Sequence, residues 1–181
     1  ALFKRNIRMK EILEKAARIK LVVFDVDGVL TDGSLFLGDD GLEYKAFNSK
    51  DGLGMKMLQR SGVIIGIITA RSSRVVALRM ESLGIEHIYQ GQEDKLPALK
   101  ELQRKLGLEA EQIAYVGDDV VDLPIMRYVG LAVAVQDAHK VALENAHWKT
   151  SVRGGRGAAR EVCDLLLEAQ GNLSAAMKKY L

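Results

Sequence analysis

Short runs of β-branched and aromatic residues recur along this chain, and segments long enough to form helices separate them. Runs that are apolar throughout are typical of strands buried on both faces of a parallel sheet. Parallel strands need crossover connections, which the intervening segments supply as helices. The sequence therefore predicts an α/β fold, with a parallel sheet covered by helices on both faces. The expected strands cover residues 20–24, 63–68, 85–89, 113–116 and 131–135.

A predicted hairpin interrupts this alternation. Residues 34–37 and 42–47 flank Gly38-Asp39-Asp40-Gly41, a turn sequence typical of two antiparallel strands. Asp51 is placed to cap the helix that follows. The expected helices run from 51 to 60, from Ser72 or Ser73 to Gly84, and over residues 94–106, 123–128, 138–145, 158–169 and 174–181.

Length and composition suit a single domain. The chain has 181 residues, of which 48% are hydrophobic, so one compact domain can bury a substantial core. We expect that domain to span residues 1–181, with a hairpin flap at about 33–47 and a C-terminal loop and helices at about 151–181. A net charge of +2 is too small to predict a nucleic-acid-binding surface.

Three further features concern the compartment. Cys163 is the one cysteine, so no disulfide can form within the chain, which favours a reducing environment. No run approaches the roughly 18 apolar residues of a membrane helix. Residues 1–20 mix charged with apolar side chains and lack the apolar core of a signal peptide. We therefore predict a cytoplasmic protein with no membrane partner.

Acidic and polar side chains follow several of the predicted strands. Asp25 and Asp27 come directly after the first strand, and side chains two apart on extended backbone share a face. Thr69 follows the second strand and Asp118 the fourth, so all of them should meet at one edge of the sheet, joined by Lys95 from a helix start. Clustered carboxylates repel one another, and a divalent cation relieves that repulsion. A lone Asp-x-Asp at a strand end is often only a solvated turn. Here Asp118 at another strand end, together with Thr69 and Lys95, argues against a solvated turn.

The motifs resemble those of the haloacid dehalogenase superfamily of phosphohydrolases over nearly the whole chain. Asp25-Val26-Asp27-Gly28 matches the first motif, Thr69 the second, Lys95 the third and Gly117-Asp118-Asp119 through Asp122 the fourth. The resemblance implies a Rossmann-like three-layer α/β/α fold. It also implies phosphate monoester hydrolysis with Mg²⁺. The second aspartate, Asp27, favours phosphoryl chemistry over dehalogenation, because the dehalogenases of the superfamily lack it.

The resemblance assigns roles to these residues. Asp25 would be the nucleophile that forms an aspartyl-phosphate, and Asp27 the general acid and then base. Thr69 would hydrogen-bond a phosphoryl oxygen, and Lys95 would neutralise charge on the transferring phosphoryl group. The implied Mg²⁺ ligands are the Asp25 and Asp118 carboxylates and the Asp27 carbonyl, with Asp122 and Asp119 in the outer coordination sphere.

A large cap domain, which most members carry, is missing from the expected elements. The hairpin is the only insertion after the first motif, and residues 69–95 offer only a helix, a strand and a turn. Because catalysis gains from excluding water, either a large substrate or a neighbouring subunit is expected to cover the site, and we favour the neighbouring subunit. The hairpin offers strand edges for such an assembly, and we expect a homotetramer.

Longer segments resemble the family that hydrolyses 3-deoxy-D-manno-octulosonate 8-phosphate. They are DVDGVLTDG at 25–33, FNSKDG at 47–52, TARSS at 69–73, YQG at 89–91 and GGRGAARE at 154–161. The resemblance implies capless tetramers that release phosphate and an acidic eight-carbon sugar for lipopolysaccharide synthesis. Ala70 departs from the glycine that is more usual there.

The implied substrate carries a carboxylate as well as a phosphate. Arginine suits a planar carboxylate, and Arg71 is the first candidate because it lies two residues past Thr69. The glycine-rich loop that carries arginines near the C-terminus either reaches a site, in this subunit or in a neighbour, or is only a solvated turn before a helix. The further candidates for substrate binding are Gly28, Asn48, Lys50, Arg74, Arg153, Arg156 and Arg160.

Three alternatives stay open. A related capless phosphatase acting on a nine-carbon sialic-acid-type 9-phosphate shares all four motifs. The chain could also be a non-catalytic scaffold that keeps only the fold. The intact acidic residues argue against this, because a scaffold need not keep mutually repelling charges such as those of Asp25, Asp27 and Asp118. A nucleic-acid 3′-phosphatase is a weaker alternative, because the charge balance predicts no large basic groove.

Overall fold

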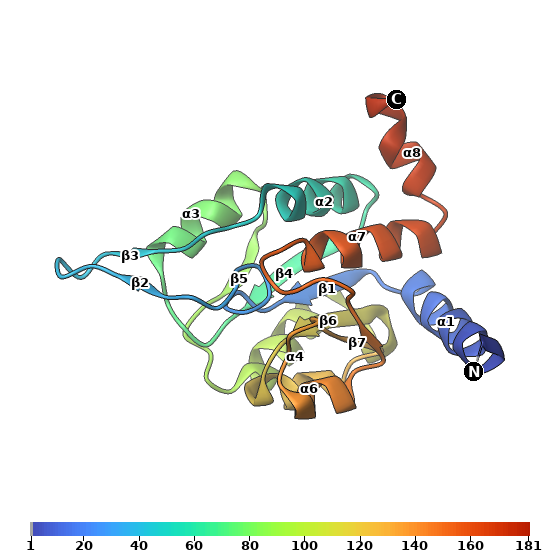
Figure 1. Cartoon of the computed structure of the whole chain (residues 1–181), viewed down its shortest axis with the longest axis horizontal. Coiled ribbons are helices and arrows are strands. Elements are labelled where there is room, and N and C mark those ends of the chain that lie inside the picture. The colour runs from blue at the N-terminus through green and yellow to red at the C-terminus, as the bar shows by residue number, and fades with distance from the viewer. Residues whose placement is uncertain (1) are drawn as a thin grey trace.

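The structure is a computed structural model that describes residues 2–181, with side chains described from Ile7 onward. It alternates strands and helices along nearly its whole length (Figure 1). The strands are β1 (Leu21–Phe24), β2 (Phe36–Leu37), β3 (Glu43–Tyr44), β4 (Ile64–Ile68), β5 (His87–Tyr89), β6 (Ile113–Gly117), β7 (Leu131–Ala134) and β8 (Trp148–Lys149). The helices are α1 (Leu2–Ala17), α2 (Ser49–Arg60), α3 (Arg74–Ser82), α4 (Lys95–Leu106), α5 (Leu123–Met126), α6 (Lys140–Asn145), α7 (Ala158–Ala169) and α8 (Leu173–Met177), with short 3₁₀ turns η1 (Ala110–Gln112), η2 (Val120–Asp122) and η3 (Lys178–Tyr180).

The main sheet is parallel throughout, as the sequence predicted. Its strand order is β5-β4-β1-β6-β7-β8. In the centre, Phe24 of β1 is paired with Ile67 of β4 on one side and Val116 of β6 on the other. The chain crosses from one side of β1 to the other between β5 and β6, so the ends of β1, β4 and β6 lie side by side where ligands bind in open α/β sheets.

Helices cover both faces of this sheet and give the predicted three layers. Helices α2 and α7 lie on one face, and α4 and α6 lie on the other (Figure 1). Central strand residues are fully buried, which is why these runs are apolar at every position. No helix in the described part of the chain is both long and apolar enough to cross a membrane.

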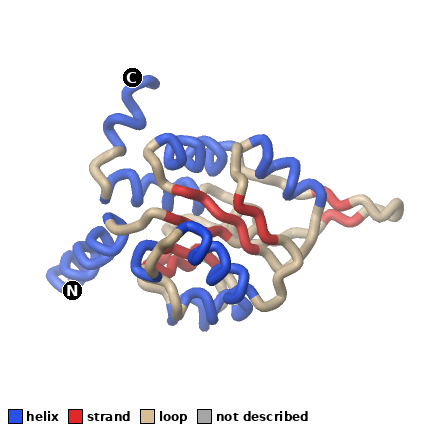
Figure 2. Tube along the Cα trace, turned by 180° about the vertical axis from the view of Figure 1, so that it is seen from behind, coloured by secondary structure: helices blue, strands red, loops and turns tan. Residues whose placement is uncertain are grey.

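The β2–β3 hairpin projects from the body of the molecule, away from both termini (Figures 1 and 2). Its strands are shorter than predicted, because only the pairs Phe36–Tyr44 and Leu37–Glu43 complete the ladder. It leaves a group of apolar side chains largely exposed. They are Leu35, Phe36, Leu37, Leu42 and Tyr44.

Two local predictions need correction. Asn48, not Asp51, caps α2, because its side chain accepts hydrogen bonds from the backbone N–H groups of Lys50 and Asp51. Ser73 is the N-cap residue of α3, but its side chain makes no capping hydrogen bond there.

Strand β8 and helix α1 were not predicted from the sequence. Gly107 ends α4 in the left-handed conformation (φ 65°), as expected for a C-terminal glycine.

Candidate active site

The predicted motif residues meet at the carboxyl end of the sheet. Asp25 follows β1, Thr69 follows β4 and Asp118 follows β6, so the sheet register alone brings them to one rim. They line an open cleft of about 260 Å³. The lining residues are Asp25, Asp27, Gly33, Thr69, Ala70, Arg71, Lys95, Asp118, Asp119 and Val121. Three larger hollows among the described residues, of about 280, 420 and 580 Å³, lie away from this acidic rim.

Lys95 is the buried cation of the site, with its side chain only 1% exposed. Its Nζ lies 2.8 Å from Asp25 Oδ2 and 2.7 Å from Asp122 Oδ1. It also donates to the Tyr115 hydroxyl at 3.2 Å. Burial alone would lower the pKa of Lys95, but the Asp25 and Asp122 carboxylates outweigh burial and raise it. Lys95 therefore stays charged at the floor of the acidic rim.

Asp122 has both carboxylate oxygens engaged by the protein. Oδ1 accepts from Lys95 and from the Tyr115 hydroxyl, and Oδ2 accepts from the backbone N–H groups of Asp118 and Asp119 at 2.9 and 3.1 Å. A Cβ on Gly117 would lie 2.7 Å from Asp122 side-chain atoms, so only glycine fits at that point. In this arrangement Asp122 organises the acidic loop and holds Lys95.

Asp122 and two other carboxylates form a candidate metal centre. Asp25, Asp118 and Asp122 each offer an oxygen, and these three atoms lie within 4.8 Å of one another. Burial and then the charges of Asp25 and Asp122 raise the pKa of Asp118 to about 8. Burial raises the pKa of Asp25 to about 6, although Lys95 opposes this shift. One lysine does not balance three acidic groups, and the oxygen donor set is the one that Mg²⁺ prefers.

Glycines give the first-motif loop its tight path. Gly28 has a φ of 84°, and a Cβ there would overlap the Asp118 carboxylate. The glycine-rich C-terminal loop packs against the other side of this turn, because a Cβ on Gly154 would overlap the carbonyl of Gly28. The Gly155 N–H donates to the Val29 carbonyl at 2.9 Å. The C-terminal loop therefore packs against the first-motif turn and supports it.

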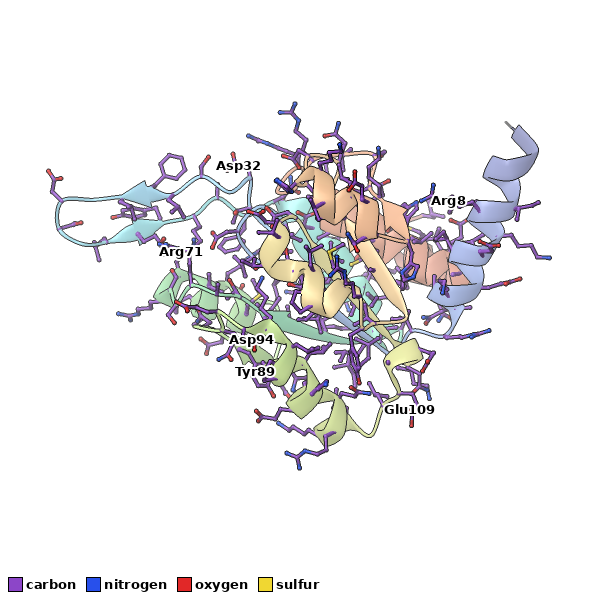
Figure 3. All side chains as sticks on the ribbon, turned by 90° about the horizontal axis from the view of Figure 1, so that it is seen from below. Arg8, Asp32, Arg71, Tyr89, Asp94 and Glu109 are labelled. Atoms are coloured by element: carbon purple, nitrogen blue, oxygen red, sulfur yellow. The ribbon has the colours of Figure 1, made fainter. Side chains whose placement is uncertain are left out.

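Asp27 is paired with Lys45, which was not predicted from the sequence as a site residue. Lys45 Nζ, from the segment after β3, lies 2.6 Å from Asp27 Oδ1 and 3.5 Å from Glu43 Oε1. Arg71, which Figure 3 shows beside the hairpin, donates to Glu43 at 2.7 Å and lies 4.0 Å from Asp27 Oδ2. Sequence could have suggested Glu43 and Lys45 only through their spacing of two on an extended strand, which puts them on one face.

Several predicted substrate-binding residues lie outside the cleft lining. Asn48 caps α2, and Lys50 and Arg74 are exposed on the first turns of α2 and α3. Arg153 is exposed on the C-terminal loop. Arg156 lies 3.5 Å from Asp32, and Arg160 pairs with Asp164 on its own helix at 3.0 Å. Their part in substrate binding stays a prediction.

The chain is similar to known phosphatases over most of its length. Residues 81–161 match a family described as haloacid dehalogenase-like hydrolase. The 3-deoxy-D-manno-octulosonate 8-phosphate phosphatase KdsC of Yersinia pestis is 49% identical over 166 residues, which cover 92% of this chain and 89% of the relative.

Solved structures agree with that relationship. A 3-deoxy-D-manno-octulosonate 8-phosphate phosphatase from Moraxella catarrhalis, in complex with magnesium ion, phosphate ion and KDO, has a TM-score of 0.94 at 46% identity, covering 96% of this chain and 99% of that one. The cobalt-bound enzyme from Haemophilus influenzae has a TM-score of 0.86 at 40% identity, covering 89% and 94%. The chain belongs to the 3-deoxy-D-manno-octulosonate 8-phosphate phosphatase family of haloacid dehalogenase-like hydrolases.

Proposed function

We propose that this chain hydrolyses 3-deoxy-D-manno-octulosonate 8-phosphate to 3-deoxy-D-manno-octulosonate and phosphate, with Mg²⁺ bound at the acidic rim. The observation that carries the proposal is the paired arrangement of Asp25 and Asp27. Asp25 is held by Lys95 at 2.8 Å, Asp27 is held separately by Lys45 at 2.6 Å, and both line one open cleft. Such a pair can divide the work of nucleophile and proton carrier.

In the first step, an Asp25 carboxylate oxygen forms a bond to phosphorus. The bond between phosphorus and the sugar oxygen breaks, and Asp27 gives its proton to the departing oxygen. Charge spreads over the phosphoryl oxygens as this happens. Lys95 neutralises that charge, and Thr69, which lines the same cleft, donates a hydrogen bond.

In the second step, the aspartyl-phosphate on Asp25 is hydrolysed. Asp27, now a carboxylate, takes a proton from water as the water oxygen bonds to phosphorus. The bond between phosphorus and the Asp25 oxygen then breaks and frees phosphate. The opening of the cleft, which a single chain leaves uncovered, gives water a path to this position.

The residues that would hold Mg²⁺ are Asp25 and Asp118 through their carboxylates and Asp27 through its carbonyl. Asp122 and Asp119 would support the ion from the outer coordination sphere. The bound ion would offset the repulsion that raises the pKa values of Asp25 and Asp118 and would polarise the phosphoryl oxygens. The magnesium-containing Moraxella structure supports this choice of metal.

Substrate choice would depend on Arg71. Its side chain is 46% exposed at the cleft, where its planar guanidinium can bind a carboxylate with two hydrogen bonds. The 49% identical relatives named for the octulosonate phosphate support this eight-carbon sugar acid. The product would then serve lipopolysaccharide synthesis.

The assembly is part of the same proposal. Residues 1–181 would act as one hydrolase domain in the cytoplasm, and four copies would form a homotetramer in which a neighbour covers the cleft. The exposed apolar side chains of the β2–β3 hairpin supply a surface for that assembly. The neighbour would take the place of a cap domain, which the elements described for residues 2–181 do not include.

The test is phosphate release from three substrates, with and without Mg²⁺. The octulosonate 8-phosphate, a nine-carbon sialic-acid-type 9-phosphate and a generic phosphate monoester would be compared by kcat/KM. We expect the octulosonate phosphate to be preferred by at least about 100-fold and activity to require the metal. Equal and slow turnover of all three would overturn the substrate assignment.

A further inference from the structure

The hairpin contributes two charged side chains to the rim that holds Asp27. Lys45 contacts Asp27 and Glu43, and Arg71 contacts Glu43 and approaches Asp27. The four groups form a ring in which positive and negative charges alternate. Two of its members come from the hairpin and two from loops that follow strands of the main sheet.

Lys45 is an unusual lysine for a projecting flap. Its side chain has no exposed surface, although the neighbouring hairpin residues Leu42 and Tyr44 are more than half exposed. Lysine is rarely fully buried unless it is paired, because the ammonium loses its hydration. Its two described ion-pair partners are both carboxylates, and the shorter contact, 2.6 Å, is with Asp27.

Two lysines whose side chains are not exposed are divided between the two aspartates of the first motif. Lys95 holds Asp25 Oδ2, and Lys45 holds Asp27 Oδ1. Without Lys45, the Asp27 carboxylate would be free to rotate toward other cationic groups at the rim. With it, one oxygen is fixed and Oδ2 stays available to carry the proton.

We propose that Lys45 is a positioning residue that fixes the Asp27 carboxylate for proton transfer, so that the orientation of the proton carrier depends on the hairpin. This inference rests on the proposed function, in which Asp27 is the general acid and base. Glu43 supports the arrangement by joining Lys45 to Arg71. The hydrogen bond from Arg71 lowers the pKa of Glu43, so Glu43 stays negative in the ring.

A direct role in substrate binding is the competing interpretation of Lys45. The Arg71 side chain is 46% exposed and can meet a ligand, whereas the Lys45 side chain has no exposed surface. A substrate-binding residue would mainly change KM. A positioning residue for the acid would mainly change kcat, and only where the leaving oxygen needs a proton.

The test compares Lys45→Met and Lys45→Arg with the wild type in the full-length, magnesium-loaded enzyme. Lys56→Met, an exposed lysine on α2, is the matched control. Single-turnover phosphoryl transfer would be measured with the octulosonate 8-phosphate, whose alkoxide must be protonated, and with p-nitrophenyl phosphate, whose phenolate leaves without a proton.

We expect Lys45→Met to slow transfer from the sugar phosphate by roughly 30-fold, which is part of the 10²–10⁴ that general acid catalysis contributes. Transfer from p-nitrophenyl phosphate should change less than about threefold, and KM for the sugar phosphate should change little. Lys45→Arg should recover most of the rate, because it keeps a cation at Asp27. Thermal unfolding of each variant would show that the fold is kept.

Three results would overturn the inference while leaving the proposed function standing. They are an equal loss with both leaving groups, a rise in KM with unchanged kcat, and a Lys45→Met enzyme as fast as Lys56→Met. A wild-type enzyme that does not release phosphate from the sugar phosphate would instead contradict the proposed function itself.

Discussion

Tyr115 donates its hydroxyl hydrogen to Asp122 Oδ1 at 2.5 Å, and both side chains are completely buried beneath the acidic rim. The same hydroxyl oxygen accepts from Lys95 at 3.2 Å. The neutral Tyr115 hydroxyl, from strand β6, thus links Lys95 to Asp122, the carboxylate that organises the acidic loop. Burial, followed by the Asp122 and Asp25 charges, raises the pKa of Tyr115 far above its usual range, so this donor keeps its proton.

Tyr115→Phe is expected to reduce kcat about tenfold, because Lys95 and Asp122 each lose a buried hydrogen-bond partner. The free energy of unfolding should fall by about 1–3 kcal/mol for the same reason. Steady-state kinetics and chemical denaturation measure the two effects. Tyr128→Phe is the control, because its hydroxyl donates to Gln103 away from the site. Equal kcat in the two variants would show that Tyr115 has no part in catalysis.

Mg²⁺ should stabilise the wild-type protein and not an Asp118→Asn variant. The ion would relieve the repulsion among Asp25, Asp118 and Asp122, whose oxygens lie within 4.8 Å of one another. Thermal unfolding with Mg²⁺ and with EDTA measures this difference. We expect a rise of several degrees in Tm for the wild type, loss of activity in EDTA, and recovery on adding Mg²⁺. A similar rise in Asp118→Asn would place the ion elsewhere.

Asp51 should make stability depend on pH below neutrality. It is buried where α2 meets α7, one oxygen accepts from the Arg160 N–H at 2.9 Å, and the other has no partner among the described residues. Burial raises its pKa to about 6. Because the folded-state pKa exceeds the unfolded value, the contribution of Asp51 to stability is greatest below about pH 4, falls as the pH rises through about 6, and is level above that.

The measurement is the unfolding free energy of wild type and Asp51→Asn from pH 4 to pH 7. Because asparagine carries no charge, we expect the wild type to lose up to about 3 kcal/mol relative to the variant over this range. A difference that stays constant with pH would show that the pKa of Asp51 is not raised. Comparing the two proteins cancels the titration of the other carboxyl groups.

Gly154→Ala should lower kcat, although Gly154 lies far along the chain from the first motif. The new methyl group would overlap the carbonyl of Gly28 and push the first-motif turn out of place. We expect a loss of 1–3 kcal/mol in stability, typical of overpacking, and at least a tenfold loss of kcat. Val152→Ala, on the same loop but partly exposed, is the control. Unchanged kcat in Gly154→Ala would show that the C-terminal loop does not support the turn.

The sheet and the main motif residues were predictable because each depends on local sequence. Buried parallel strands are apolar throughout, so β1, β4, β6 and β7 stand out, and the polar residues that follow them must meet at one rim. Strand β8 was missed because its two residues are too few to show a pattern. Lys45 was missed because its pairing with Asp27 depends on where the hairpin folds back, which no local pattern specifies.

Tyr115 shows a different limit. In the sequence it reads as one more large side chain in a strand, and the partner that gives it a role lies across the loop at Asp122. The capping of α2 by Asn48 and not by Asp51 has a similar cause, because both residue types cap helices, and Asp51 lies in the first turn with its carboxylate turned to the Arg160 N–H of α7.

The most direct test of the account is to trap the phosphoryl group on the enzyme. The Asp27→Asn variant with Mg²⁺ and p-nitrophenyl phosphate should form the aspartyl-phosphate but hydrolyse it slowly, because the leaving phenolate needs no proton and the base is lost. Mass spectrometry of the acid-quenched, digested protein should find one phosphoryl group on the peptide at Asp25. Release of p-nitrophenol with that peptide unmodified, or with the phosphoryl group on another residue, would contradict the assignment of Asp25 as nucleophile.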